Sequence, residues 1–427
     1  MRTQLLVALF LAASVSAQAS FVVDASSGPG SQFTDIQTAV LAVPSGSVLV
    51  VRAGSYSPVL IDGKGLTILC DAGAAIAPPP FFFATGPFLT VRNTQPNQVV
   101  AVSGLGFGPV GAQFHDGILV QNAMGLVVLD GQGATVQPTV SPTVTNGASL
   151  KITTSSQVVI RDYELQGGMQ SSGGGGAPLP QFGCVVDSSS VVFESCRLRG
   201  SNSLGASDQI RFGKAALVAT TSRIELVATS VTGGNGLSTT GLFGPLQLLA
   251  DPAVLATNAQ LVARGAAAHA IAGGIAPAAG AQPLVQLGAI SGTGSLRIDP
   301  VIPVTGAVAA SVLVTTAPNA RLTSNVPALG GVAAATCTAV SGSLVVVAIG
   351  EPAPASTVPG LPDPLWLGAA NSLVVDFGVA SAAGQFAVAV PLPGQPGLRG
   401  ITLVWQAAEL GPAGFDALSN PSATLIR

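Results

Sequence analysis

Apolar and polar positions in the middle of the chain recur with a fixed step. Three similar six-residue segments, 160–165, 193–198 and 226–231, begin 33 residues apart. Each follows a short polar turn and is itself followed by a glycine, namely Gly167, Gly200 or Gly233. The segments are short and rich in β-branched residues, which favours strands separated by turns. A step in this size range is typical of stacked repeats, so we predict that each repeat is one coil of a parallel β-helix.

The constant step also predicts the register between coils. Residues 33 apart should lie on adjacent strands, about 4.8 Å apart along the stack. Two inward columns are then expected, Ile160 with Phe193 and Leu226, and Leu165 with Leu198 and Val231. Three outward columns are expected beside them: Arg161, Glu194, Val227; Glu164, Arg197, Ser230; and Gln166, Arg199, Thr232. The first two of these outward columns place opposite charges side by side, and we expect Arg161 to pair with Glu194 and Glu164 with Arg197.

The amino-terminal part of the solenoid has the pattern of a capped end. Apolar residues at helical spacing (Phe33, Ile36 and Val40) predict a short helix over 33–42, with Ser31 or Thr34 as its cap. Strands are expected at 21–24, 47–52, 59–62 and 66–69. A helix over the first coil would cover core residues and strand edges that an open end leaves exposed.

This segment carries a family resemblance. The sequence FVVDASSGPGSQFTDIQTAVLAVPSGSVLVVRAGSYSPVLIDGKGLTIL, residues 21–69, resembles the amino-terminal segment of pectinesterases and other pectate-lyase-like right-handed parallel β-helix proteins. The resemblance implies the fold and says little about chemistry, because one fold hosts many functions. The catalytic phrases of pectinesterases and the paired aspartates of polygalacturonases have no counterpart in this sequence.

The repeat stops near residue 300, and a second part follows. Strands are expected there at 309–315, 343–350, 372–378, 385–390 and 400–408, separated by Pro-rich turns, which favours a β-sandwich. The tail PGLRGITLVWQAAELGPAGFDALSNPSATLIR is similar to a carboxy-terminal β module of secreted bacterial proteins. We therefore predict an all-β protein with a signal peptide at 1–19, a right-handed parallel β-helix at 20–300 and a β-sandwich-like module at 304–427.

Composition and the first residues bear on location and partners. Arg2, an apolar run over 5–13 and small residues at 15–19 have the anatomy of a secretory signal. Charged residues make up 8% of the chain, against about 25% in ordinary globular proteins. No basic cluster is present, which argues against nucleic acid, and no later apolar run is long enough to predict a transmembrane segment. We expect a secreted or extracellular protein associated with the cell surface.

The four cysteines allow a disulfide but predict no metal site. Their spacing matches no zinc pattern. Cys184 and Cys196 fall in one repeat and could bridge across a coil, while two buried free thiols remain the alternative. Cys196 occupies the position of Tyr163 and Thr229 in the neighbouring repeats, which is expected to point inward.

The outward charges are the best candidates for contact with an extracellular polysaccharide or another cell-surface component. The candidate residues are Arg161, Asp162, Glu164, Glu194, Arg197, Arg199, Asp208 and Arg211, joined by Trp366 in a Pro-rich loop. We expect a non-catalytic structural or adhesive role without a cofactor. The alternative is a polysaccharide lyase or glycoside hydrolase that acts through the outward face of residues 161–214, and only this alternative calls for Ca²⁺, since such lyases hold it with several carboxylates.

Overall fold

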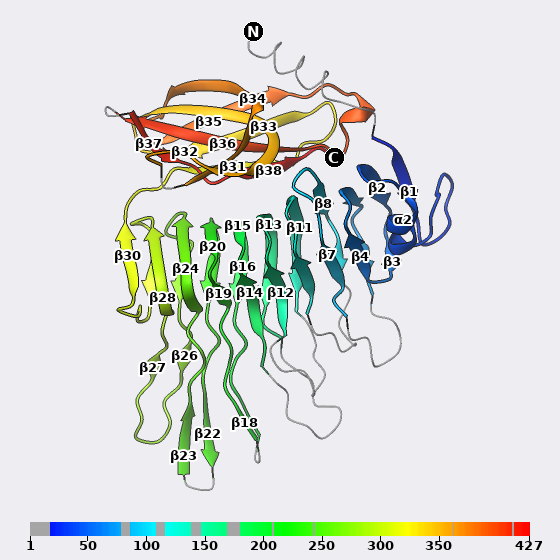
Figure 1. Ribbon diagram of the computed structural model, residues 1–427. Helices are drawn as coiled ribbons and strands as arrows, with labels where there is room; N and C mark the ends of the chain where they lie inside the picture. Colours follow the sequence, from blue (N-terminus) through cyan, green and yellow to red (C-terminus); the bar gives the residue numbers. More distant parts are fainter. Residues whose placement is uncertain are drawn as a thin grey trace.

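The computed structural model describes all residues except 1–17, 78–85, 108–115, 138–146, 169–179, 207–208, 242–243, 362 and 412–413. This part of the chain is all-β apart from one α-helix and a 3-10 turn: a parallel β-solenoid is followed by antiparallel sheets (Figure 1). The regular part of the solenoid makes about six turns over residues 59–305. The fold class predicted from the repeat is thus confirmed.

Each coil contributes strands to three faces of the solenoid. The first face contains β1 (Ser20–Val23), β2 (Ser47–Val51), β5 (Leu66–Cys70), β8 (Val99–Ser103), β11 (Leu126–Val136), β13 (Gln157–Gln166), β15 (Ser190–Glu194), β20 (Arg223–Val227), β24 (Val254–Arg264), β28 (Ile290–Ile298) and β30 (Val312–Thr316). The second contains β4 (Val59–Asp62), β7 (Leu89–Arg92), β10 (Ile118–Gln121), β12 (Ala148–Thr153), β14 (Phe182–Asp187) and β19 (Leu217–Thr220). The third contains the ends of β11 and β13 with β16 (Arg197–Arg199), β21 (Ser230–Thr232), β25 (Ile271–Ala272) and β29 (Val304–Thr305), and near the amino terminus β3 (Gly54–Tyr56), β6 (Ala74–Ile76) and β9 (Gly106–Phe107) form a separate parallel sheet.

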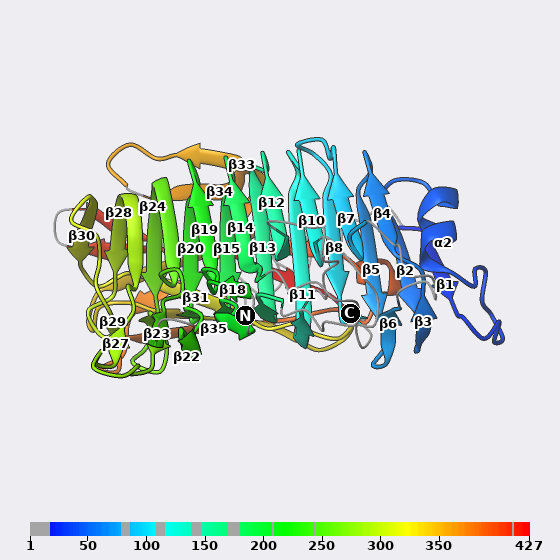
Figure 2. The same cartoon turned by 90° about the horizontal axis from the view of Figure 1, so that it is seen from below.

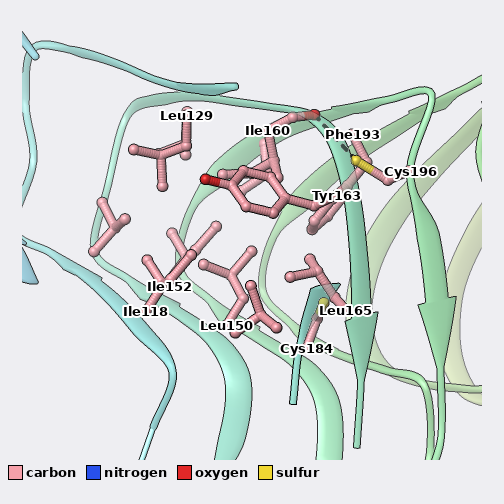
Figure 3. Close-up of a cluster of buried hydrophobic side chains, with 14 of the residues drawn as sticks. Ile118, Leu129, Leu150, Ile152, Ile160, Tyr163, Leu165, Cys184, Phe193 and Cys196 are labelled. Carbon is pink, nitrogen blue, oxygen red and sulfur yellow. Dashed lines mark hydrogen bonds between the residues drawn. The ribbon is translucent and has the colours of Figure 1, made fainter. Parts of the chain in front are cut away.

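The register between coils is the one that the 33-residue step predicts. Ile160 lies opposite Phe193 and Phe193 opposite Leu226. Leu165, Leu198 and Val231 form the second inward column, and all six side chains are buried. Tyr163 and Cys196 also point into the coil, among the apolar side chains shown in Figure 3. These columns fill the interior, so each coil is stabilised by burying its apolar side against the next.

Non-glycine residues hold the turns in a left-handed backbone conformation. Between the second and first faces these residues are Thr154, Ser188 and Thr221, with φ of 49°, 48° and 47°. A buried hydroxyl follows each of them, in Ser155, Ser189 and Ser222. The Ser155 N–H donates to Ser189 Oγ at 3.0 Å, and the Ser189 N–H donates to Ser222 Oγ at 3.1 Å. This ladder satisfies backbone donors that the turn would otherwise leave unpaired inside the protein.

Glycines allow the chain to leave and re-enter the stack at one corner. Three hairpins extend there (Figure 1): β17 (Leu204–Ala206) with β18 (Gln209–Arg211), β22 (Leu237–Gly241) with β23 (Gly244–Leu248), and β26 (Ile275–Ala276) with β27 (Val285–Gln286). A Cβ atom on Gly167 would lie 2.2 Å from Gln181 O, and one on Gly200 would lie 2.2 Å from Lys214 O. The glycines that follow the repeats are therefore required by close backbone approach.

Helix α2 (Ile36–Ala42) covers the first coil, as the sequence indicated. Ile36, Ala39 and Val40 are buried in the solenoid core. The predicted caps were wrong, because the side chain of Asp35 accepts the hydrogen bond from Gln37 N at 3.0 Å. The predicted early strands correspond to β1, β2, β4 and β5.

Two antiparallel sheets form the carboxy-terminal module. One contains β31 (Arg321–Ser324), β32 (Val332–Thr338) and β35 (Gln385–Pro391). The other contains β33 (Leu344–Thr357), β34 (Pro364–Val379), β36 (Thr402–Gly411), β37 (Gly414–Leu418) and β38 (Ser422–Leu425), and the short 3-10 turn η1 is Pro396–Leu398. Both sheets contribute to one buried core that includes Leu322, Val390 and Trp405. Trp405 is 0% exposed in this core.

One predicted strand belongs to a different part of the molecule. The strand expected at 309–315 in the carboxy-terminal module is β30, which pairs in parallel with β28 and is the last strand of the first face. Val304 likewise pairs with Ile271 of the preceding coil. The change of character near residue 300 therefore precedes the last solenoid strands, because short strands with polar turns look alike in sequence in both parts.

Candidate functional site: the covered face of the solenoid

The carboxy-terminal module lies across the first face of the solenoid (Figures 1 and 2), and its strands run crosswise to the solenoid strands. Ser422, at the start of β38, hydrogen-bonds Glu194, whereas Arg427 at the chain end donates to Cys70 O, several coils away. The last residues therefore cross coil after coil. We call the outward side chains of β11, β13, β15, β20, β24 and β28 the covered face.

The centre of the covered face is apolar. Val128, Val159 and Val192 are each 1% exposed and form one cluster with side chains from the module, among them Trp366, Val404, Ala423 and Leu425. Burial of this many branched side chains is a strong driving force for association, at about 25 cal/mol per Å² of apolar surface. The module and the solenoid are joined here by a continuous hydrophobic contact.

A buried ion pair lies beside this apolar strip, which we call the Arg161 cluster. Arg161 Nη2 lies 2.9 Å from Glu194 Oε2, and both residues are buried. Ser422 Oγ donates to Glu194 Oε2 at 3.1 Å, and Arg161 Nη2 donates to Ser324 Oγ at 3.2 Å. Two serines of the module thus add hydrogen bonds to a charge pair of the solenoid, which offsets part of the cost of removing it from water.

A larger group of charges, the Asp363 cluster, lies toward the carboxy-terminal coils. Asp363 belongs to the module, and its carboxylate lies within 2.5 Å of Arg223, 3.0 Å of Arg264 and 2.5 Å of Arg297. These arginines come from β20, β24 and β28, three successive coils. Glu225 neutralises part of the remaining charge, at 3.1 Å from Arg223 and 3.3 Å from Arg264.

The charged groups of the Asp363 cluster are buried, so their removal from water costs free energy that their ion pairs must offset. Arg264 is 0% exposed and Asp363 is 2% exposed. Burial alone would raise the pKa of Asp363, but the charges of Arg264, Arg297 and Arg223 outweigh this effect and hold its pKa below the ordinary value. The carboxylate is therefore stabilised in its ionised form by the solenoid on which it rests.

The structure separates the residues that the sequence grouped as one outward surface. Arg161 and Glu194 pair as expected, but in the buried interface, and Trp366 is 1% exposed in the same interface. Glu164, Arg197 and Arg199 lie on the third face, where Glu164 pairs with Arg199 at 3.3 Å. The expected Glu164–Arg197 ion pair is thus replaced by one with Arg199, although Arg197 lies opposite Glu164 in the register.

The other candidates are dispersed. Asp162 is exposed at the turn between the first and third faces, with φ of 52°. Arg211 lies in β18, in one of the hairpins, and Asp208 lies outside the described residues. The candidates whose side chains the structure describes do not converge on one groove.

Sequence reasoning missed most of the residues that carry the interface. Arg223, Glu225, Arg264, Arg297 and Asp363 were not singled out. One signal was present: residues 158–160 and 191–193 are apolar at three consecutive positions, Val-Val-Ile and Val-Val-Phe. A strand with one face in water alternates, whereas an uninterrupted apolar strand is covered on both faces.

The cysteines lie inside the protein as free thiols. Cys184 and Cys196 are both buried and unbridged, as are Cys70 and Cys337. Figure 3 shows Cys184 and Cys196 on different walls of one coil, with Cys196 near Ile160, whose carbonyl oxygen is 3.4 Å from Cys196 Sγ. The structure thus has the second of the two arrangements considered from the sequence. Burial raises the pKa of Cys196 to about 12.

Comparisons with protein-family models, with curated proteins and with solved structures found no match. Among the described residues, no group of three or more His, Cys, Asp or Glu side chains is placed to hold a metal ion. The same residues include no helix that is long and apolar enough to cross a membrane.

Proposed function

We propose that the protein is a secreted, non-catalytic β-helix with a structural or adhesive role at the cell surface, of the right-handed type that the amino-terminal segment resembles. The observation that carries this proposal is the burial of charged residues on the first face. The charged side chains of the Arg161 and Asp363 clusters form ion pairs beneath the carboxy-terminal module.

The chemistry of the alternative, a polysaccharide lyase or hydrolase, needs a different arrangement. A lyase requires a base that can reach the sugar and a cation that stabilises the charge developing on the substrate. Arg161 donates hydrogen bonds to Glu194, Ser324 and Ser422. An arginine fixed in this way under the module is poorly suited to accept a proton from a sugar.

We assign contact with a polysaccharide to the third face. Arg197 and Arg199 are exposed there, and Glu164 is partly exposed between them. Side chains at this position can exchange hydrogen bonds with sugar hydroxyls or carboxylates without disturbing the interface. We therefore propose Glu164, Arg197 and Arg199 as the polysaccharide-contacting residues.

The experiment uses the full mature protein. It is incubated with pectin, polygalacturonate and alginate, with and without Ca²⁺, and ultraviolet absorbance of unsaturated products and release of reducing sugar are followed. We expect no turnover. Binding is measured in parallel by co-sedimentation with insoluble polysaccharide, where Arg197→Ala and Arg199→Ala should weaken retention and Arg399→Ala, an exposed arginine of the module, should not.

Product formation that disappears in Arg197→Ala, on the exposed third face, would overturn the non-catalytic proposal and support the enzyme alternative. Retention that is equal in all three arginine variants would refute the assignment to the third face.

A further inference from the structure

The two ends of the first-face sheet differ in how their edges are closed. At the amino-terminal end, the outer edge of β1 is paired by the chain itself. Val22 N–H donates to Gln32 Oε1 at 2.6 Å, and Val22 O accepts from Gln32 N at 2.9 Å. Helix α2 covers the adjacent core. At Val22, this end therefore has no unpaired backbone N–H or C=O group with which another strand could pair.

At the carboxy-terminal end, β30 is paired on one side. Within the described residues its ladder partner is β28, and no strand pairs with its other edge. Ala317 N–H donates to Ile298 O of β28. Because backbone groups alternate sides along a strand, the N–H and C=O groups of Val314 and Thr316 point to the open edge.

Two large apolar side chains of β30 are exposed to solvent at this end. Val314 continues the inward column of Leu296, yet Val314 is 46% exposed while Leu296 is 1% exposed. Leu313 beside it is 71% exposed. Natural edge strands usually carry a charge, a proline or a cover that prevents association. The sequence of β30, Val-Leu-Val-Thr-Thr, contains neither a charge nor a proline.

We propose that this end of the solenoid binds a second copy of the same chain through antiparallel pairing of β30 with β30. The occupant follows from the strand itself. Each coil is covered by the next through a strand ladder and stacked apolar side chains, whereas β30 lacks this cover among the described residues. A second copy of β30 presents the same outward backbone groups and exposed apolar side chains. Because Gln32 pairs with Val22 and α2 covers the core at the other end, we place the contact between two carboxy-terminal ends, and a two-fold dimer closes the assembly.

The alternation of the strand fixes the register. If Val314 and Thr316 of one copy pair with Thr316 and Val314 of the partner subunit, both residues exchange N–H and C=O bonds, and the two-fold axis passes beside Thr315. The two Thr315 residues then form a non-hydrogen-bonded pair with Cα atoms about 4.5 Å apart. The strand is short, so we expect an association that depends on concentration in the accessible range.

The first test is sedimentation velocity of the full mature protein over a concentration series. We expect a monomer–dimer equilibrium. Val314→Pro removes an edge N–H without removing a bond to β28, and Val314→Lys places a charge at the edge, so each should weaken dimerisation by at least ~10-fold. Val379 is 63% exposed and is the last residue of edge strand β34. Val379→Lys is therefore the matched control and should dimerise like the parent.

The second test reports the geometry. Thr315→Cys should form a disulfide-linked dimer on mild oxidation, because the expected Cα separation lies in the range that disulfides adopt. The four native cysteines are buried and give little background. Val379→Cys should not cross-link. A parent protein that is monomeric at all concentrations, a dimer insensitive to both Val314 variants, or a dimer that Val379→Lys abolishes would overturn the proposal.

Discussion

Single residues set the backbone at the corners of each coil. Thr221 has φ of 47° and an exposed side chain, and its N–H donates to Thr257 O. The left-handed region is unfavourable for β-branched residues and is better tolerated by asparagine. The sequence showed that a turn lies here, but its backbone conformation was not predicted, because threonine gives no signal for a positive φ.

We expect Thr221→Asn to stabilise the protein by about 1 kcal/mol, since it relieves this conformational cost. Thermal unfolding monitored by circular dichroism measures the change. Thr232→Asn is the control: it makes the same exchange at an exposed position in extended strand β21 and should be neutral or destabilising. Equal effects at both positions would contradict the explanation.

The glycine after each repeat is a second residue-scale constraint. A Cβ on Gly200 would approach Lys214 O to 2.2 Å and Gly234 N to 2.7 Å, both backbone atoms that cannot turn away. We expect Gly200→Ala to destabilise the protein by about 3 kcal/mol. Gly394→Ala, where no atom lies within 4 Å, should change stability little, and urea unfolding curves of the two variants compare them. A Gly200→Ala protein as stable as the parent would mean that the backbone of Lys214 and Gly234 can move away from residue 200 at little cost.

At the scale of strands, the repeat determined what could be predicted. A constant step fixes which residues lie opposite one another, so the columns through Ile160, Arg161 and Leu165 were all predicted from the sequence and are present. What covers a column is a separate matter, because the partners of Arg161 on the module are 163 and 261 residues away. No local pattern encodes the partners in that contact, and so the outward charges were predicted to contact an extracellular polysaccharide or another cell-surface component.

The two ion pairs of the repeat, Arg161–Glu194 and Arg199–Glu164, should therefore differ in their contribution to the free energy of unfolding. Glu194→Ala would leave the Arg161 charge buried without its partner, and we expect a loss of about 3–5 kcal/mol. Glu164→Ala removes an ion pair whose arginine side chain is 50% exposed and should cost about 1 kcal/mol or less. Chemical denaturation of both variants tests this. Similar losses would indicate that the Arg161 cluster is open to solvent.

At the scale of the whole molecule, the carboxylate of Asp363 connects the module to three successive coils of the solenoid. Because the pKa of Asp363 is lowered in the folded protein, its contribution to stability is complete above the ordinary value of 3.8 and is lost as pH falls below it. We expect acidification through this range to weaken docking and to shift the fluorescence of Trp366 to longer wavelength as it meets water. Asp363→Asn should show the shift already at neutral pH, whereas in Trp366→Phe the shift should be absent.

The central claim is that the first face of the solenoid is closed by the module in solution. The reaction rate of a thiol introduced as Val192→Cys measures this most directly, since Val192 is 1% exposed beneath the module and the native cysteines are buried. We predict that a thiol reagent modifies this cysteine roughly 100-fold more slowly than Val379→Cys, and that Asp363→Asn in the same protein accelerates it. Equal rates at positions 192 and 379 would show that the face is open, and would contradict the account.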